Sequence, residues 1–461
     1  MITSFPCGVG QSTTSLALGS GGGTPPTSAA LGSPLQEKPV TTWHAPRAWL
    51  AGDDLTPDVL IGVEEGRIVS VGSGTASQAD ASLSGVILPG LVSAHSHAFH
   101  RALRGRTHSA GGDFWAWRAP MYELANSLTP DSYRVLAAKT FKEMVSSGIT
   151  TVGEFHYVHH QPDGTPYDDP NAFGLAIADA ADDAGIRLTL IDTAYLTSDV
   201  DGSPVLAEQC RFSDGSIAAW RERVLALAEA LAHRPMVRVG VAAHSVRGVG
   251  VADLERIRLT AEELDTPLHI HVSEQVSENK ATLTAHGATP VGLLSRKGFL
   301  TERTTLVHAT HLTADDITTI AESGAMVCFC PTTESDLGDG IGPATELSEA
   351  GVPLCLGSDS NAVVDILREA YRLEQHDRLR LQRRGIHTPQ ARMAAASTIG
   401  MRSLGWHDGG IAVGGPADFI AVDPESDELS GTGGDLGAIV SAATRASVTD
   451  VVIAGVACKR S

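Results

Sequence analysis

Two pairs of histidines, each with one residue between its members, are the most chemically suggestive feature of the sequence. His95 and His97 end one apolar run, and His269 and His271 end another. In an extended strand, residues two apart point to the same side, so both imidazoles of a pair can face one metal ion. A single pair is weak evidence, because two hydrogen-bonded surface histidines give the same pattern.

Further titratable residues follow apolar runs later in the chain. Glu274 comes three residues after His271, and His308 and Asp359 each end a later run. Four side chains can then complete one shell of three nitrogens and one oxygen: His95, His97, His271 and Asp359. Such a donor set suits one Zn²⁺ or a similar divalent ion per chain, which would lower the pKa of a bound water towards neutrality.

The remaining groups have the chemistry to move protons at such a centre. Asp359 can accept a proton from the water, and Glu274 can pass it to the leaving group. His308 can hydrogen-bond the developing tetrahedral centre. No lysine ends the run that closes at Ala242, Ala243 and His244. We therefore expect neither a bridging carbamate nor a second metal.

The elements that must position these residues alternate between short apolar runs and amphipathic segments. Eight runs are predicted to be strands: Val86–Leu91, Thr150–Phe155, Arg187–Asp192, Val237–Ala242, Pro267–Val272, Thr304–Val307, Ala325–Cys330 and Val352–Gly357. Five segments have the apolar spacing of helices: Ser132–Ser147, Asn171–Ala184, Ser216–Ala232, Ala252–Leu264 and Ala314–Ser323. This alternation predicts a (β/α)8 TIM barrel, an α/β fold whose chemistry sits at the carboxyl ends of the strands.

Shorter alternating segments near both chain ends predict a small β-sandwich domain built from the two termini. The N-terminal stretch is rich in Gly, Ser, Thr and Pro, and it contains no Lys or Arg before Lys38, so it lacks the basic region of a secretory signal. The predicted division is a disordered extension (1–40), the first part of the β-domain (41–85), the barrel (86–404) and the second part of the β-domain (405–461).

The composition excludes several classes of protein. The chain has 461 residues with 34 Lys+Arg and 54 Asp+Glu, a net charge of −20, and 42% of its residues are apolar. That balance excludes a largely disordered chain. The acidic excess argues against nucleic-acid and anionic-membrane partners, and no apolar run is long enough to span a bilayer. We expect a cytoplasmic enzyme with a small-molecule substrate.

Six cysteines are too few and too irregularly spaced for a disulfide framework. Cys328 and Cys330 alternate along an apolar run, which is typical of buried free thiols in a reducing compartment. A Cys-x-Cys metal site is the alternative, but no second thiol pair completes a tetrahedral set.

Several motifs resemble the amidohydrolase superfamily and, within it, the formimidoylglutamate deiminases. The superfamily motifs are Pro89-Gly-Leu-Val-Ser-Ala-His-Ser-His97, His271-Val-Ser-Glu274, Leu306-Val-His308 and Gly357-Ser-Asp359. The narrower ones are His95-Ser-His-Ala-Phe99, Phe114-Trp-Ala-Trp-Arg118, Glu154-Phe-His-Tyr-Val-His-His160, Ala243-His-Ser-Val-Arg247 and Leu337-Gly-Asp-Gly340. The resemblance spans about residues 45 to 425. It implies a mononuclear zinc barrel that hydrolyses N-formimidoyl-L-glutamate to N-formyl-L-glutamate and ammonia, in histidine degradation, and a homodimer.

The resemblance also implies which residues bind the substrate: Arg118, Tyr157, His244 and Arg247, with His100 as a replacement contact. His100 stands where members of the subgroup carry Gln, and Asn361 stands where they carry His. Guanidinium groups suit the two carboxylates of such a substrate, because they can bind a carboxylate through two parallel hydrogen bonds. The alternative for each arginine is a solvated loop charge.

The other histidines have a less specific interpretation. His156, His159 and His160 could suggest a second metal site, but hydrogen-bonding roles in a substrate loop are favoured, since no further carboxylate is evident nearby. His269 and His311 are expected to pack beside the metal ligands and orient them.

Two other functions remain open. One is a mononuclear deaminase acting on a purine, pterin or triazine ring, whose pocket would favour aromatic stacking over paired arginines. The other is a metal-binding scaffold without catalysis, against which the presence of Glu274, His308 and Asp359 argues.

Overall fold

The computed structural model describes residues 39–107, 114–406 and 409–458. The features below all belong to one unit, Val40–Ser461. The predicted extension, residues 1–40, lies outside the described residues except for its last two. Among the described residues, no helix is long and apolar enough to cross a membrane.

Eight parallel strands follow one another in chain order to form the barrel sheet. They are β6 (Leu91–Ser96), β7 (Ile149–His156), β8 (Arg187–Ala194), β9 (Val237–Ser245), β10 (Leu268–Val272), β11 (Thr304–His308), β12 (Met326–Phe329) and β13 (Leu354–Leu356). Most of their residues are buried, as expected for parallel strands covered on both faces. The predicted (β/α)8 barrel is confirmed.

Residues next to the first and last strands close the barrel. The amide of Asp359, just beyond β13, donates to the carbonyl oxygen of His95 at 3.0 Å. The amide of His97 donates in turn to the carbonyl oxygen of Asp359 at 2.9 Å. These two bonds form a parallel bridge between Ser96 and Asp359. Barrel closure therefore runs through the residues predicted to hold the metal.

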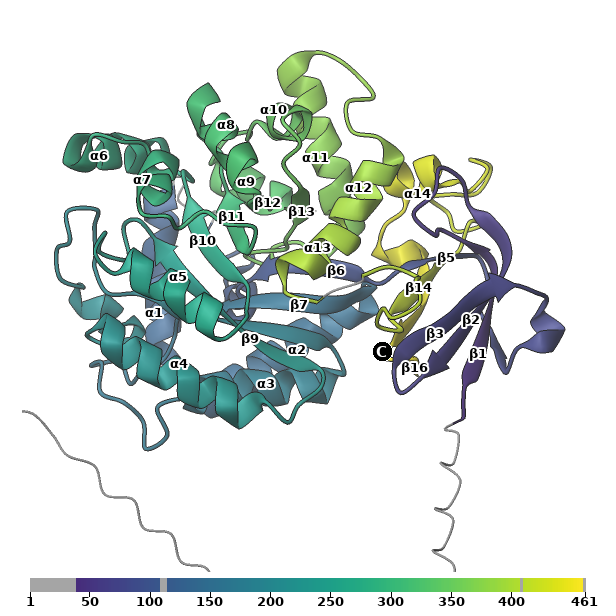
Figure 1. Ribbon diagram of the computed structural model, residues 1–461, viewed down its shortest axis with the longest axis horizontal. Coiled ribbons are helices and arrows are strands. Elements are labelled where there is room, and N and C mark those ends of the chain that lie inside the picture. The colour runs from purple at the N-terminus through teal and green to yellow at the C-terminus, as the bar shows by residue number, and fades with distance from the viewer. Residues whose placement is uncertain (1–38, 108–113, 407–408, 459–461) are drawn as a thin grey trace, which may run out of the picture. The chain divides into compact units, whose positions relative to one another are not determined.

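Helices connect the strands and lie outside the barrel sheet (Figure 1). The helices of this region are α1 (Phe114–Ser127), α2 (Pro130–Ser146), α3 (Ala172–Ala184), α4 (Ile217–Leu231), α5 (Leu254–Glu263), α6 (Val276–His286), α7 (Pro290–Arg296), α8 (Ala314–Ser323), α9 (Pro331–Leu337), α10 (Ala344–Glu349), α11 (Ile366–Leu381), α12 (Pro389–Ala395) and α13 (Thr398–Ser403), with short 3-10 turns at η2 (Ala98–Leu103) and η3 (Ala207–Phe212). The five predicted helical segments correspond to α2, α3, α4, α5 and α8. Their ends follow local chemistry: the side chain of Thr313 caps α8 by accepting from the amide of Asp316, and Gly324 ends it with a positive φ.

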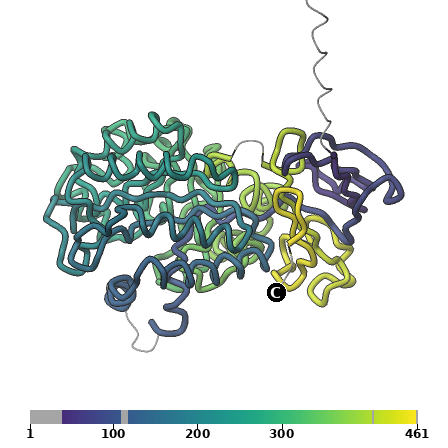
Figure 2. Tube along the Cα trace, turned by 90° about the horizontal axis from the view of Figure 1, so that it is seen from below, coloured from purple at the N-terminus to yellow at the C-terminus, as the bar shows by residue number. Residues whose placement is uncertain are grey.

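A second sheet combines strands from both ends of the chain. Its strands are β1 (Thr41–Ala48), β2 (Thr56–Glu64), β3 (Arg67–Ser73), β4 (Ala81–Ser82), β5 (Val86–Pro89), β14 (Phe419–Val422), β15 (Val448–Ile453) and β16 (Val456–Cys458), with η1 (Ala76–Gln78), α14 (Leu436–Ala442) and η4 (Arg445–Ser447) between them. The sheet order is β16-β15-β14-β5-β1-β2-β3, with β4 beside β1. Figure 2 shows the purple and yellow ends of the chain side by side. Trp43 and Phe419 pack edge to face within it, with ring centroids 5.7 Å apart.

The prediction that Val86–Leu91 is the first barrel strand is wrong. Val86–Pro89 forms β5, which pairs with β1 and β14 in the second sheet, and the barrel begins with β6 at Leu91. Gly90 lies between the two strands, where a Cβ atom would come within 2.1 Å of the Thr150 hydroxyl oxygen. The apolar run continues unbroken across this change of sheet, so hydrophobicity alone does not reveal it. The domain boundaries given above stay predictions.

Candidate active site

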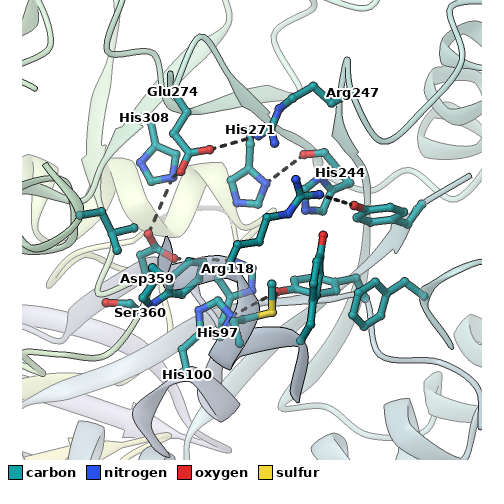
Figure 3. A pocket seen from close by; sticks show the side chains of 17 residues that line it. His97, His100, Arg118, His244, Arg247, His271, Glu274, His308, Asp359 and Ser360 are labelled. Carbon is teal, nitrogen blue, oxygen red and sulfur yellow. Dashed lines mark hydrogen bonds and ion pairs between the residues drawn. The ribbon is translucent and has the colours of Figure 1, made fainter. Parts of the chain in front are cut away.

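One cavity at the carboxyl ends of the barrel strands collects almost all the predicted site residues (Figure 3). Ten of them line it: His97, His100, Arg118, Tyr157, His244, Arg247, His271, Glu274, His308 and Asp359. The eleventh, His95, is fully buried and contacts the rings of His97 and His271. His95 and His271, for example, are 176 positions apart in the sequence, and the barrel topology brings them together at this rim.

Four of these side chains converge as a metal site would require. Nε2 of His95 and Nε2 of His97 each lie 3.5 Å from Oδ1 of Asp359, and Nε2 of His271 lies 3.1 Å from Nε2 of His95. Burial lowers the pKa of all three imidazoles, so they are neutral. Burial acts in the opposite direction on Asp359, but its hydrogen bond to His95 and the surrounding charges hold the pKa of Asp359 below its usual range. Neutral imidazoles with an ionised carboxylate are the donors a divalent ion prefers here.

Hydrogen bonds behind the imidazoles fix which nitrogen faces the centre. Nδ1 of His97 donates to the carbonyl oxygen of Phe155, and Nδ1 of His271 donates to that of His244, each at 2.9 Å. Each Nε2 atom therefore presents a lone pair to the shared centre. The lone pair of His97 faces the Asp359 carboxylate, and that of His271 faces Nε2 of His95. These buried donors lie close enough together to bind one cation, so the residues present fit the metal that the resemblance implies.

Glu154 of β7 holds the turn that carries the first histidine pair. Its Oε2 atom accepts from the hydroxyl of Ser96 at 2.9 Å, and its Oε1 atom accepts from the amide of Ala98 at 2.6 Å. Glu154 was not predicted as a site residue, although a carboxylate inside a fully buried strand is itself a signal of a specific partner.

Two residues of the candidate site have a strained backbone. His308 and Asp359 adopt positive φ values of 69° and 39°, respectively.

Glu274 and His308 lie next to the four converging residues. Oε1 of Glu274 is 3.9 Å from Nε2 of His308, which in turn is 3.7 Å from Oδ2 of Asp359. Nδ1 of His308 lies 3.5 Å from Oε1 of Glu334. Burial would lower the pKa of His308, but the hydrogen bond to Glu334 and the charges of Glu274 and Asp359 outweigh it and raise this pKa to about 10.

Arg247 is buried between two carboxylates rather than solvated. Nη2 donates to Oε2 of Glu274 and Nε donates to Oε2 of Glu278, both at 3.2 Å. The interpretation of Arg247 as a solvated loop charge is therefore wrong, because its side chain is only 9% exposed. The same contacts fix the orientation of Glu274 towards the cavity.

Arg118 belongs to a helix rather than to a loop. It lies in α1, where Nη2 donates to the Tyr195 hydroxyl at 3.3 Å and the guanidinium lies 5.1 Å from the ring centroid of Tyr122. Elsewhere in the cavity lining, Nε2 of His100 is 3.1 Å from the Tyr157 hydroxyl. Burial lowers the pKa of His100 to about 3, so this imidazole is neutral.

Several lining residues were missed by sequence analysis: Trp117, Met121, Tyr122, Tyr195, Phe212, Leu337 and Ser360. Tyr195 directly follows β8, so its position at the end of a strand could have identified it. Ser360 follows the predicted ligand Asp359 and could have been found in the same way. Trp117 and Tyr122 lie on α1 next to Arg118, so the motif that indicated Arg118 could have identified them too.

The remaining histidines and cysteines are accounted for by other contacts. A carboxylate does lie near His156 and His159, namely Asp192, contrary to prediction. Arg223 contacts it with two hydrogen bonds of 2.6 and 2.8 Å and already supplies the positive charge. His269 and His311 each bond a backbone carbonyl, at 2.9 and 2.8 Å. The thiols Cys328, Cys330 and Cys355 are free and buried together below the site.

Three proteins similar to this chain are a deiminase, an amidohydrolase and a deaminase. A formimidoylglutamate deiminase of Pseudomonas aeruginosa is 37% identical over 387 residues, which cover 81% of this chain and 84% of that protein. The crystal structure of an amidohydrolase from Brucella melitensis matches with a TM-score of 0.83 and 32% identity, over 90% of this chain and 94% of that one. A zinc-bound adenosine deaminase from Xanthomonas campestris matches with a TM-score of 0.78 and 26% identity, over 90% and 92% of the two chains.

The family model described as the amidohydrolase family matches residues 86–458, which include both the barrel and the C-terminal strands of the second sheet. With a parallel eight-stranded barrel and the predicted histidines and carboxylates gathered at its carboxyl end, the chain belongs to the amidohydrolase family.

Proposed function

We propose that the protein hydrolyses N-formimidoyl-L-glutamate to N-formyl-L-glutamate and ammonia, as a zinc-dependent cytoplasmic enzyme of histidine degradation. The observation that supports this most strongly is one cavity that combines a metal-type donor set, the pair Glu274 and His308, and the guanidinium of Arg118. The 37% identical Pseudomonas deiminase supports the same substrate.

One Zn²⁺ per chain would be held by His95, His97, His271 and Asp359. When bound, it supplies a Lewis acid that lowers the pKa of a water molecule to near neutrality. Asp359 would accept a proton from the attacking water, whose oxygen bonds to the amidine carbon. Glu274 would pass this proton to the departing nitrogen, so that the C–N bond breaks and ammonia leaves. The imidazolium of His308 donates a hydrogen bond to the tetrahedral centre as negative charge develops there.

The substrate is positioned by other residues that line the same cavity. We assign substrate contacts to His100, Arg118, Tyr157, His244 and Arg247, all of which line it. Burial, reinforced by the charges of Arg247 and Arg118, holds the pKa of His244 well below its usual range, so this ring is a neutral hydrogen-bonding group. Arg247 also holds Glu274, which couples substrate binding to the proton-transfer group.

Arg118→Met is expected to reduce kcat/KM for formimidoylglutamate about ten- to a hundredfold, the usual effect of losing one charge-assisted contact. Hydrolysis of an uncharged formamidine should change little, because that substrate has no carboxylate. Steady-state ammonia release with both substrates measures the difference. Arg247→Met is the contrasting variant, and it should impair both substrates, since its partner Glu274 serves both. Equal losses on both substrates in Arg118→Met would contradict a carboxylate contact at Arg118.

A second candidate is deamination of a purine or related ring. The observation that favours it is the aromatic wall of the cavity, which includes Trp117, Tyr122, Tyr195 and Phe212. The adenosine deaminase relative has the same fold. Zinc-loaded protein offered formimidoylglutamate, adenosine and guanine in parallel separates the two functions. Ammonia from the first substrate alone supports the deiminase, and ammonia from a purine alone overturns it.

A further inference from the structure

A buried glutamine contacts two tyrosine hydroxyls at the wall of the cavity. Nε2 of Gln209 donates to the hydroxyl oxygen of Tyr122 at 2.9 Å and to that of Tyr195 at 3.0 Å. Gln209 lies on η3 and is fully buried, whereas both tyrosines line the cavity. The glutamine therefore stands behind the wall and does not itself reach a ligand.

The orientation of the Gln209 amide is fixed by the backbone. Its Oε1 atom accepts a hydrogen bond of 2.8 Å from the amide of Leu206, which only the carbonyl end of the side chain can do. The NH₂ end must then face the tyrosines and donate one hydrogen bond to each of them. Arg118 also donates to the oxygen of Tyr195. Both phenol oxygens thus accept from Gln209 on the side away from the cavity, and that of Tyr195 also accepts from Arg118.

This arrangement determines where the phenolic protons point. Each hydroxyl has one proton to donate. Gln209 and Arg118 offer no acceptor for these protons, because the atoms that face the phenol oxygens are all donors. The phenolic protons are therefore directed into the cavity, beside the Arg118 guanidinium.

We propose that Tyr122, Tyr195 and Arg118 form a subsite that presents only donors, and that Gln209 is the positioning residue that gives it this polarity. Its ligand is a carboxylate at the end of the substrate remote from the amidine. A group with N–H donors, such as an amide or a ring amine, would leave donors facing donors and is disfavoured there. The inference rests on the proposed function only in assigning this carboxylate to formimidoylglutamate.

Gln209→Glu tests whether Gln209 makes the subsite donor-only, because this substitution hardly changes the size of the side chain. A carboxylate would accept from both phenols, turn their protons away from the cavity and add a negative charge beside Arg118. The expected result is a KM for formimidoylglutamate and a Kd for N-formyl-L-glutamate about ten- to a hundredfold higher, with kcat within about twofold. Gln382→Glu, the same change at an exposed position after α11, should leave both constants unchanged.

The double variant Tyr122→Phe/Tyr195→Phe provides a second route, because it removes the O–H donors and keeps the rings. It should raise the KM for formimidoylglutamate and the Kd for N-formyl-L-glutamate as well. It therefore tests the subsite even if Gln209→Glu does not fold. Unchanged KM and Kd in either folded variant overturn the subsite. If wild-type protein binds N-formyl-L-glutamate calorimetrically and loses that binding in the variants, but releases no ammonia from formimidoylglutamate, the subsite stands and the proposed function fails.

Discussion

Replacement of Glu274 by glutamine is expected to lower kcat about 10²- to 10⁴-fold while leaving the metal content unchanged. The amide keeps the size of the carboxylate and can still accept a hydrogen bond from Arg247. It cannot, however, take up a proton and deliver it to the departing nitrogen. Glu274 is outside the proposed ligand set, so the loss should appear in turnover alone. Ammonia release and metal analysis on the same preparation measure both quantities.

Glu278→Gln is the matched control for that experiment. Glu278 contacts the same guanidinium, but it does not line the cavity. Its amide should disturb the position of Arg247 and reduce kcat by less than about tenfold, well below the effect of losing the proton transfer at Glu274. Near-wild-type turnover in a metal-replete Glu274→Gln enzyme would remove Glu274 from the proton transfer. A large loss in both variants would indicate that Glu274 acts mainly by holding Arg247.

Replacement of His271 by alanine is expected to abolish both metal binding and activity. The variant removes one of three imidazoles from a four-donor site and leaves the carboxylate of Asp359 without enough partners to hold a divalent ion tightly. The wild-type protein should contain one ion per chain by elemental analysis, and His271→Ala almost none. Two equivalents in the wild-type protein would contradict a mononuclear site.

His269→Ala is the control in the same strand. Its ring points to the backbone carbonyl of Ser403 and not to the shared centre, so it should keep both ion and activity. If His271→Ala retains its ion and His269→Ala does not, the ligand assignment within β10 is wrong.

The parts of the fold and site that sequence predicts are those that depend on local periodicity. Strands alternate their side chains with a period of two, so a histidine pair at the end of an apolar run must face one side. The parallel barrel then brings such run ends to one rim. This reasoning alone predicts that His95, His97, His271, His308 and Asp359 lie near each other. The helices α3, α4 and α8 were predictable for the same reason, because their apolar spacing and end residues are local.

The parts that sequence does not predict depend on contacts between distant segments. Gln209 meets Tyr122 across 87 positions, and nothing near either residue in the sequence indicates the other. Arg118 reaches the cavity from a helix, where the strand-end rule does not apply, so only the resemblance predicts its place in the site. The change of sheet at Gly90 is hidden because β5 and β6 are both buried, and burial makes both strands uniformly apolar.

The closure of the barrel through Asp359 has a consequence for how the protein is made. The two backbone bonds that join the first strand to the last use the same residues that bring the imidazoles to the carboxylate, His95 and His97 on one side and Asp359 on the other. A ribosome must therefore have synthesised the chain beyond residue 359 before the complete donor set can exist. A nascent chain interrupted earlier carries the histidines without their carboxylate, so the proposed metal site can be completed only late in translation.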